Sequence, residues 1–149
     1  MTLESIMTRH VVTVGMDDEL GMIRDLFERY RFHHVVVVDK CRVVGVISDR
    51  DLLRNVSPFV GKPSERTMDA ASVHRKAHQI MTRKLVWASP QTKVADAALV
   101  MYNNRISCLP VLDKNGACVG IVTTRDFLRW SLEHLTDRTC VNELGKKAA

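Results

Sequence analysis

The sequence predicts a mixed α/β domain in which one β-α-β-β-α unit occurs twice. The letters IMTR at residues 6–9 return at residues 80–83, and 15 of the 49 positions from 6 to 54 are identical in the second copy. Unrelated sequences of ordinary composition match at roughly 6% of positions, so the chain contains an internal duplication. One copy of this length makes a marginal core. We therefore expect both copies to pack face to face about a pseudo-twofold axis, as one domain.

Each copy begins with a short apolar strand and an amphipathic helix. In the first copy we expect the strand at residues 11–14 and a helix that starts after Asp18 as N-cap. In the second copy we expect the strand at residues 85–88 and a helix that starts after Thr92. Both helices repeat apolar residues at helical spacing, so each has one face that packs on the core.

A hairpin and a second helix complete each copy. The continuous apolar runs at 35–38 and 109–112 predict strands that are buried on both faces. Turn residues follow at 39–41 and 113–116, the second with Asn-Gly, which favours a tight hairpin. The next strands, at 43–47 and 118–122, should therefore pair antiparallel with their predecessors. The second helix of each copy should begin near residues 48 and 123.

Composition bounds the class of protein. The chain has 149 residues and a net charge of +5, without an apolar run of the roughly 18 residues that a membrane span needs and without a signal peptide's apolar core. Its basic residues are scattered, which argues against a duplex-binding face. Cys41, Cys108, Cys118 and Cys140 lack CxxC spacing. We expect a small cytoplasmic protein with reduced thiols, no membrane segment and no nucleic-acid partner.

A motif at the end of each copy carries a family resemblance. It reads GVISDRD at 45–51 and GIVTTRD at 120–126, and each instance follows an opening Ile-Met-Thr at a similar separation. With the LPVLD run at 109–113, this pattern resembles a tandem pair of CBS domains (a Bateman module) over about residues 3–135. The resemblance implies an α+β/α/β fold of two β-α-β-β-α repeats about a pseudo-twofold axis. We divide the single module 1–149 into repeat one (3–56), a linker (57–79), repeat two (80–135) and a polar tail (136–149).

The motif places a hydroxyl three residues before a carboxylate in each copy, as Ser48/Asp51 and Thr123/Asp126. Each pair lies where a buried strand gives way to a helix, whose N-terminal N–H groups suit a phosphate. The hydroxyl can also bind the phosphate, and the carboxylate can accept both hydroxyls of a ribose. The same pattern is a capping box, and Asp49 and Thr124 are alternative caps. Local sequence leaves both interpretations open.

The resemblance extends the site to the start of the first strand and the approach to the second strand of each repeat. Arg50 and Arg125 either reach a phosphate or pair with surface carboxylates. Phe32 and Ile106 either sandwich a base or pack in the core. The complete set of expected nucleotide-binding residues is Thr123, Asp126, Arg125, Ser48, Asp51, Arg50, Thr82, Arg83, Val86, Ile106, Leu109, Val12, Phe32 and Val35.

The two copies differ near these positions. The first has His33-His34 where the second has Ser107-Cys108. The imidazoles either make binding sensitive to pH or block the cleft of the first copy, so we favour the Thr123/Asp126 site.

Metal binding is the other chemistry that these side chains suggest. His33, His34 and Cys41 fall near one hairpin, and His74 and His78 are four residues apart, but neither group has further metal ligands. We expect no metal site, and without a recognisable nucleophile–base motif we expect no enzyme.

The resulting hypothesis is a stand-alone regulatory CBS pair that needs no cofactor. It would bind AMP, ADP, ATP, S-adenosylmethionine or NAD as an effector and signal to a separate protein. We expect a homodimer in which exposed apolar faces around Ile23/Phe27 and Met101 make contact. The alternative is a ligand-independent dimerisation or protein-interaction module, and nucleic-acid binding is a weaker third hypothesis. The linker either covers a site entrance or adds to the dimer contact.

Overall fold

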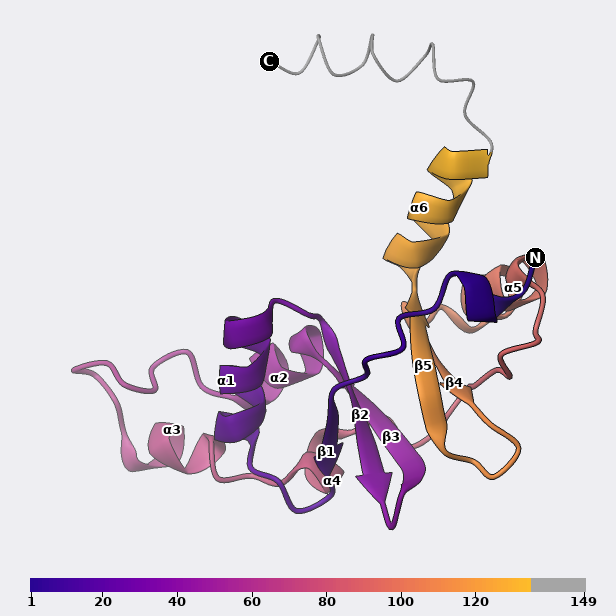
Figure 1. The fold of residues 1–149 in the computed structure, drawn as a ribbon. Coiled ribbons are helices and arrows are strands. Elements are labelled where there is room, and N and C mark those ends of the chain that lie inside the picture. The colour runs from indigo at the N-terminus through magenta and orange to yellow at the C-terminus, as the bar shows by residue number, and fades with distance from the viewer. Residues whose placement is uncertain (135–149) are drawn as a thin grey trace, which may run out of the picture.

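The computed structural model describes residues 1–134, in which two small β-sheets lie side by side with helices around them (Figure 1). The elements of the first copy are β1 (Thr13–Gly15), α1 (Leu20–Tyr30), β2 (His34–Asp39), β3 (Arg42–Ser48) and α2 (Asp49–Asn55). Those of the second copy are α5 (Val94–Asn104), β4 (Cys108–Leu112), β5 (Cys118–Thr123) and α6 (Thr124–His134). The short helices η1 (Leu3–Ser5), α3 (Thr67–Ser72) and α4 (Ala77–Ile80) precede or connect the copies. The polar tail and Cys140 lie outside the described residues.

The two hairpins confirm the predicted antiparallel pairing. Strands β2 and β3 pair from His34↔Ser48 to Asp39↔Arg42, and β4 and β5 pair from Cys108↔Thr123 to Leu112↔Cys118. Both ladders shift register at equivalent places, between Val37 and Val38 and between Val111 and Leu112. The duplication therefore extends to an irregularity of the backbone.

The predicted first strand of the second copy is wrong. In the first copy, β1 pairs parallel with β2, and the Val36 N–H donates to the Val12 carbonyl. The residue equivalent to Val36 is Pro110, which has no N–H to donate. The segment at 85–88 therefore pairs with β4 only through a parallel bridge between Ala88 and Val111. In the first copy the strand is also shifted, to Thr13–Gly15.

The predicted helix caps are wrong by one residue. Helix α1 follows Glu19 and α5 follows Lys93, neither with a side-chain cap. Asp18 Oδ2 instead accepts from the Gly15 N–H at 2.6 Å, and Thr92 Oγ1 accepts from the Ser89 N–H at 3.1 Å. Backbone carbonyls accept hydrogen bonds from the first N–H groups of both helices. The carbonyls of Val73 and Arg75 accept from the start of α1, and that of Met1 accepts from the Val94 N–H of α5. Segments outside each repeat thus complete its first helix.

These segments are exchanged between the copies. The N-terminal segment crosses to the second copy (Figure 1), where Leu3 is fully buried in the core and Thr8 bridges to Ile121 of β5. Residues 77–82 pack on the first copy in the same way, with Thr82 bridged to Val46 of β3. Each Ile-Met-Thr motif therefore lies against the final strand of the other copy.

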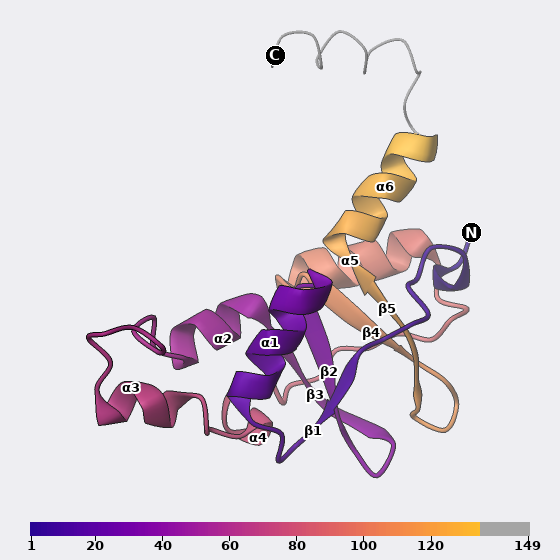
Figure 2. The same cartoon turned by 60° about the vertical axis from the view of Figure 1, so that its left-hand side comes forward.

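Besides the core of each copy, a separate apolar cluster around Val36, Cys108 and Ile121 joins the two sheets. Figure 2 shows the hairpins of the two copies next to each other. The expectation that Ile23, Phe27 and Met101 form exposed faces is wrong, because 0–8% of their surface is accessible and they belong to the two repeat cores. The exposed apolar residues of the helices are others, among them Leu53 of α2, Leu99 and Tyr102 of α5 and Leu128 of α6. Among residues 1–134, no helix is long and apolar enough to cross a membrane.

Candidate functional site

Two clefts between the copies are related by the duplication. The larger has a volume of about 710 Å³ and the smaller about 210 Å³. The walls of the larger cleft come from both copies: Thr8, His10, Val11, Val12, Arg31, Phe32, His33 and His34 of the first, with Ile121, Thr123 and Asp126 of the second. The equivalent positions line the smaller cleft: Thr82, Lys84, Leu85, Val86, Arg105, Ile106, Ser107 and Cys108, with Val46, Ser48 and Asp51. Each cleft thus joins the strand ends of one copy to the hydroxyl–carboxylate pair of the other.

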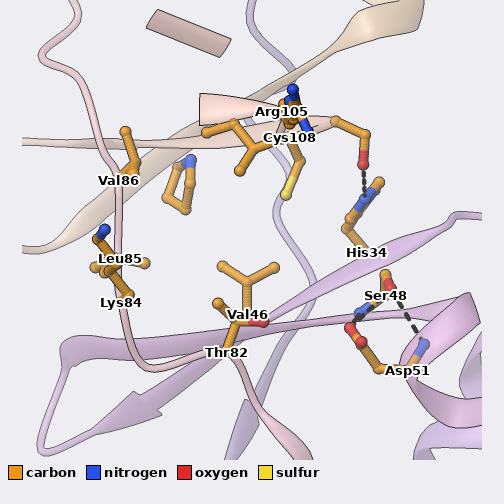
Figure 3. A pocket seen from close by; sticks show the side chains of 13 residues that line it. His34, Val46, Ser48, Asp51, Thr82, Lys84, Leu85, Val86, Arg105 and Cys108 are labelled. Atoms are coloured by element: carbon orange, nitrogen blue, oxygen red, sulfur yellow. Dashed lines mark hydrogen bonds between the residues drawn. The ribbon is translucent and has the colours of Figure 1, made fainter. Parts of the chain in front are cut away.

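The smaller cleft is drawn in Figure 3, where Val86, Leu85 and Cys108 lie across from Ser48 and Asp51. Its volume is below the roughly 300–1,000 Å³ typical of small-molecule sites, whereas the larger cleft falls within that range. The larger cleft also extends along the starts of α2 and α6, where it is lined by Asp49, Arg50, Arg54, Thr124 and Arg125.

Ser48 and Asp51 form a capping box, and Thr123 donates to Asp126 in the same way as Ser48 donates to Asp51. Asp51 Oδ2 accepts from the Ser48 N–H at 2.8 Å and from the Ser48 hydroxyl at 2.7 Å. Asp126 Oδ2 accepts from Thr123 at the same two distances. Ser48 is the N-cap of α2, so the alternative cap Asp49 is excluded, and Thr124 is the first residue of α6. Capping does not exclude ligand binding, because a hydroxyl can rotate and both pairs border a cleft.

The two carboxylates differ in their surroundings. Asp126 is 7% exposed, and its Oδ1 accepts from Arg129 Nη2 at 3.1 Å. The equivalent arginine of the first copy, Arg54, makes no such bond within residues 1–134 and lines the larger cleft instead. A carboxylate has about four lone-pair sites, of which Asp126 uses three and Asp51 uses two.

His34 and Ser107 form a wall that both clefts share. His34 Nε2 lies 2.9 Å from Ser107 Oγ, and Figure 3 shows the bond from the side of the smaller cleft. Burial of the imidazole lowers the pKa of His34. The expectation that the histidines restrict only the site of the first copy's motif is wrong, since His33 and His34 line the cleft of Thr123 and Asp126. His33 Nδ1 lies 2.8 Å from Asp49 Oδ2 at its rim.

Most of the expected binding residues border a cleft. The larger cleft includes Val12, Phe32, Ser48, Arg50, Asp51, Thr123, Arg125 and Asp126, and the smaller includes Ser48, Asp51, Thr82, Val86 and Ile106. Val35 and Leu109 are fully buried in the repeat cores, so their side chains border neither cleft. Arg83 lies outside both and donates to the His78 carbonyl at 2.9 Å.

Three arginines at the clefts were missed from the sequence: Arg31, Arg54 and Arg105. Arg31 and Arg105 end the two first helices with left-handed backbones, at φ 54° and 53°. Both residues lie at the same sequence distance from the Ile-Met-Thr motif of their own copy, which identifies them as equivalent positions.

The thiols and imidazoles do not assemble a metal centre within residues 1–134, where no group of three or more His, Cys, Asp or Glu side chains is placed to hold an ion. Cys41, Cys108 and Cys118 are free. Burial raises the pKa of the Cys108 thiol to about 12, so this side chain of the smaller cleft is a neutral apolar wall.

Comparison with known proteins agrees with this architecture. The model of the CBS domain family matches residues 3–58 and again residues 77–133. A CBS domain-containing protein of Dictyostelium discoideum is 31% identical over 128 residues, which are 85% of this chain and 88% of that protein.

Two solved structures share the fold and were determined with ligands. CBSX2 in complex with AMP has a TM-score of 0.74 at 23% identity, covering 91% of this chain and 98% of that one. The CBS domain pair of protein MJ0100, in complex with 5′-methylthioadenosine and S-adenosyl-L-methionine, has a TM-score of 0.72 at 23% identity, covering 87% and 94%. The predicted fold class is confirmed: the chain belongs to the CBS domain family and contains two CBS repeats.

Proposed function

We propose that this CBS pair is a regulatory module that binds an adenosyl compound in the larger cleft and signals to a separate partner protein. The observation that carries the proposal is the joining of an apolar wall from one copy to a polar wall from the other. Val12 and Phe32 offer apolar surface for a base, and Thr123 and Asp126 offer groups for a ribose and a phosphate. The adenosyl ligands in the structures of CBSX2 and MJ0100 support this ligand class.

Binding would change the bond between Thr123 and Asp126 at the start of α6. With the Thr123 hydroxyl donating to Asp126, the carboxylate has about one lone-pair site left for a ribose. Rotation of that hydroxyl toward a phosphate frees a second site, and the backbone N–H of Thr123 still holds Asp126. The ligand thereby exchanges one internal hydrogen bond for bonds that join the two copies. A ligand that bridges both copies favours one relative orientation of the repeats, which a partner protein can recognise.

Isothermal titration of the purified protein with AMP, ATP, S-adenosylmethionine and GTP tests the proposal. Asp126→Asn should weaken the binding of an adenosyl ligand by about 100-fold, because two charge-assisted hydrogen bonds are lost. Thr123→Val keeps the shape and removes only the hydroxyl, and we expect about a 10-fold loss. Asp96→Asn, on the exposed surface of α5, is the matched control and should bind normally.

Thermal unfolding of each variant shows whether it is folded at the temperature of the titration. If no adenosyl compound binds at about 1 mM, the proposal is excluded. At that concentration a ligand with a Kd of about 10 µM would add roughly 2.7 kcal/mol to the free energy of unfolding. Equal affinity of Asp126→Asn and the unaltered protein would place the ligand elsewhere.

A second candidate is an interaction module that needs no ligand, with homodimerisation through the outer helices. It is favoured by the exposed apolar residues of α2, α5 and α6, such as Leu53 (79% exposed), Tyr102 (82%) and Leu128 (60%). Light scattering of Leu53→Glu and Leu128→Glu would show whether these faces join two copies. The candidate then requires that Asp126→Asn retain the regulatory effect and that the helix-face variants abolish it.

A further inference from the structure

We propose that the larger cleft selects a nucleoside di- or triphosphate and that arginine side chains bind the phosphates beyond the first. The inference rests on the proposed function and adds the charge class of its ligand. The side chains that carry it are Arg31, Arg50, Arg54 and Arg125.

The four arginines reach the cleft from three places in the fold. Arg31 ends α1, Arg50 and Arg54 are one helical turn apart on α2, and Arg125 lies in the first turn of α6. Residues four apart share a helix face, so the two α2 arginines form one pair. The other copy contributes Arg125, and the cationic groups therefore border the cavity from both copies.

These guanidinium groups are uncompensated. Within residues 1–134, none of the four has a hydrogen bond or an ion pair to another side chain, and all four are exposed. The carboxylates of the same cleft are already engaged: Asp49 with His33, Asp51 with Ser48, and Asp126 with Thr123 and Arg129. Four arginines border the cleft against three carboxylates, and one of these carboxylates, Asp126, is paired with Arg129, so the net charge around the ligand is positive.

Arginine suits this task because its planar guanidinium donates two parallel hydrogen bonds to phosphate oxygens. A single terminal phosphate is served by the Thr123 hydroxyl and one guanidinium. Four guanidinium groups match a longer chain, in which each added phosphate brings further charge and acceptor oxygens. The cavity of about 710 Å³ has room for such a ligand.

The smaller cleft provides an internal reference. Arg105 is the counterpart of Arg31 and lines it, but among residues 1–134 the only other cation that lines it is Lys84. Arg129, the counterpart of Arg54, is bonded to Asp126 and lines neither cleft. The arginines are identical in the two copies, but four of them border the larger cleft and one borders the smaller.

Titration with AMP, ADP and ATP, in EDTA and at about 150 mM salt to screen weak surface attraction, tests the inference. We expect ATP to bind at least about 10-fold more tightly than AMP, since one bidentate phosphate contact is worth about that factor. Arg31→Gln and Arg54→Gln should each reduce ATP affinity about 10-fold and AMP affinity less than about 2-fold. The matched control is Arg105→Gln, which should leave both affinities unchanged.

The outcomes separate this inference from the function on which it rests. Equal affinities for AMP and ATP would overturn the inference and leave the proposed function standing. Loss of the ATP preference in Arg105→Gln instead of Arg31→Gln would place the phosphates in the smaller cleft and also overturn it. Failure of all three nucleotides and of S-adenosylmethionine to bind would overturn the proposed function itself.

Discussion

The two clefts are built from equivalent positions, yet they differ in size and in chemistry. Phe32, His33 and His34 border the larger cleft where Ile106, Ser107 and Cys108 border the smaller. The volumes are about 710 Å³ and 210 Å³. The backbone and the hydroxyl–carboxylate pairs have kept the symmetry of the duplication, whereas the surrounding side chains have lost it. Arg31, Arg50 and Arg54 have identical counterparts in the second copy, so the ligand selectivity of a cleft depends on which of these arginines border it and not on residue identity alone.

The largest difference in stability should separate the two carboxylates. Both substitutions remove the acceptor of the hydroxyl and N–H groups at the start of a helix, and Asp126→Ala also removes the carboxylate that pairs with Arg129. We therefore expect Asp126→Ala to lower the free energy of unfolding by about 2–3 kcal/mol and Asp51→Ala by about 1 kcal/mol. Urea denaturation measures both values.

Asp96→Ala serves as the control, because this exposed residue of α5 borders neither cleft. Equal costs for Asp126→Ala and Asp51→Ala would mean that Arg129 adds nothing and that the carboxylates are equivalent. The two clefts would then differ only in volume and in the arginines that line them.

The features that the sequence predicted well are those that depend on local pattern. The β-branched run of β2 and the Asn115-Gly116 turn specify the hairpins, because alternation, burial and turn chemistry act over a few residues. The GVISDRD and GIVTTRD motifs led to both hydroxyl–carboxylate pairs for the same reason. Both pairs border a cleft.

The features that it missed depend on contacts between distant segments. Asp18 and Thr92 were expected to cap helices, but the carbonyls that serve α1 and α5 come from exchanged segments far along the chain. The missing strand at 85–88 follows from Pro110, whose lost N–H is visible in the sequence only once its pairing partner is known. Arg54 shows the same limit: its counterpart Arg129 forms an ion pair, and only the fold distinguishes them.

A smaller loss of stability is expected for substitutions at Gly45 and Gly120, where the exchanged segments lie against the final strand of the other copy. A Cβ added to Gly45 would lie 3.0 Å from the Thr82 carbonyl oxygen, and one added to Gly120 would lie 3.2 Å from that of Thr8. Both would also meet a methionine sulfur, which can move more easily than backbone. We expect Gly45→Ala to cost about 2 kcal/mol and Gly120→Ala about 1 kcal/mol, as overpacking does.

Gly15→Ala is the control for these two substitutions, because its nearest contact would be an ordinary 3.5 Å to the Asp18 side chain. Thermal unfolding of the three variants ranks them. If Gly120→Ala lowered stability more than Gly45→Ala, the contact at Thr8 would be packed more tightly than the contact at Thr82. If neither substitution lowered stability, the exchanged segments would be loosely held.

The smallest effect concerns pH and the wall that the clefts share. Burial lowers the pKa of His34 from 6.5, and electrostatic interactions with His33 and Arg50 lower it further, while Asp49 and Asp51 act in the opposite direction. Since the unfolded chain then takes up the proton at a higher pH than the folded protein, the free energy of unfolding should fall as the pH drops through about 6.5. His34→Gln keeps a partner for Ser107 without an ionisable ring, so it should flatten this slope. If His34→Gln keeps the full slope, the wall does not respond to protons, and the histidines distinguish the clefts by shape alone.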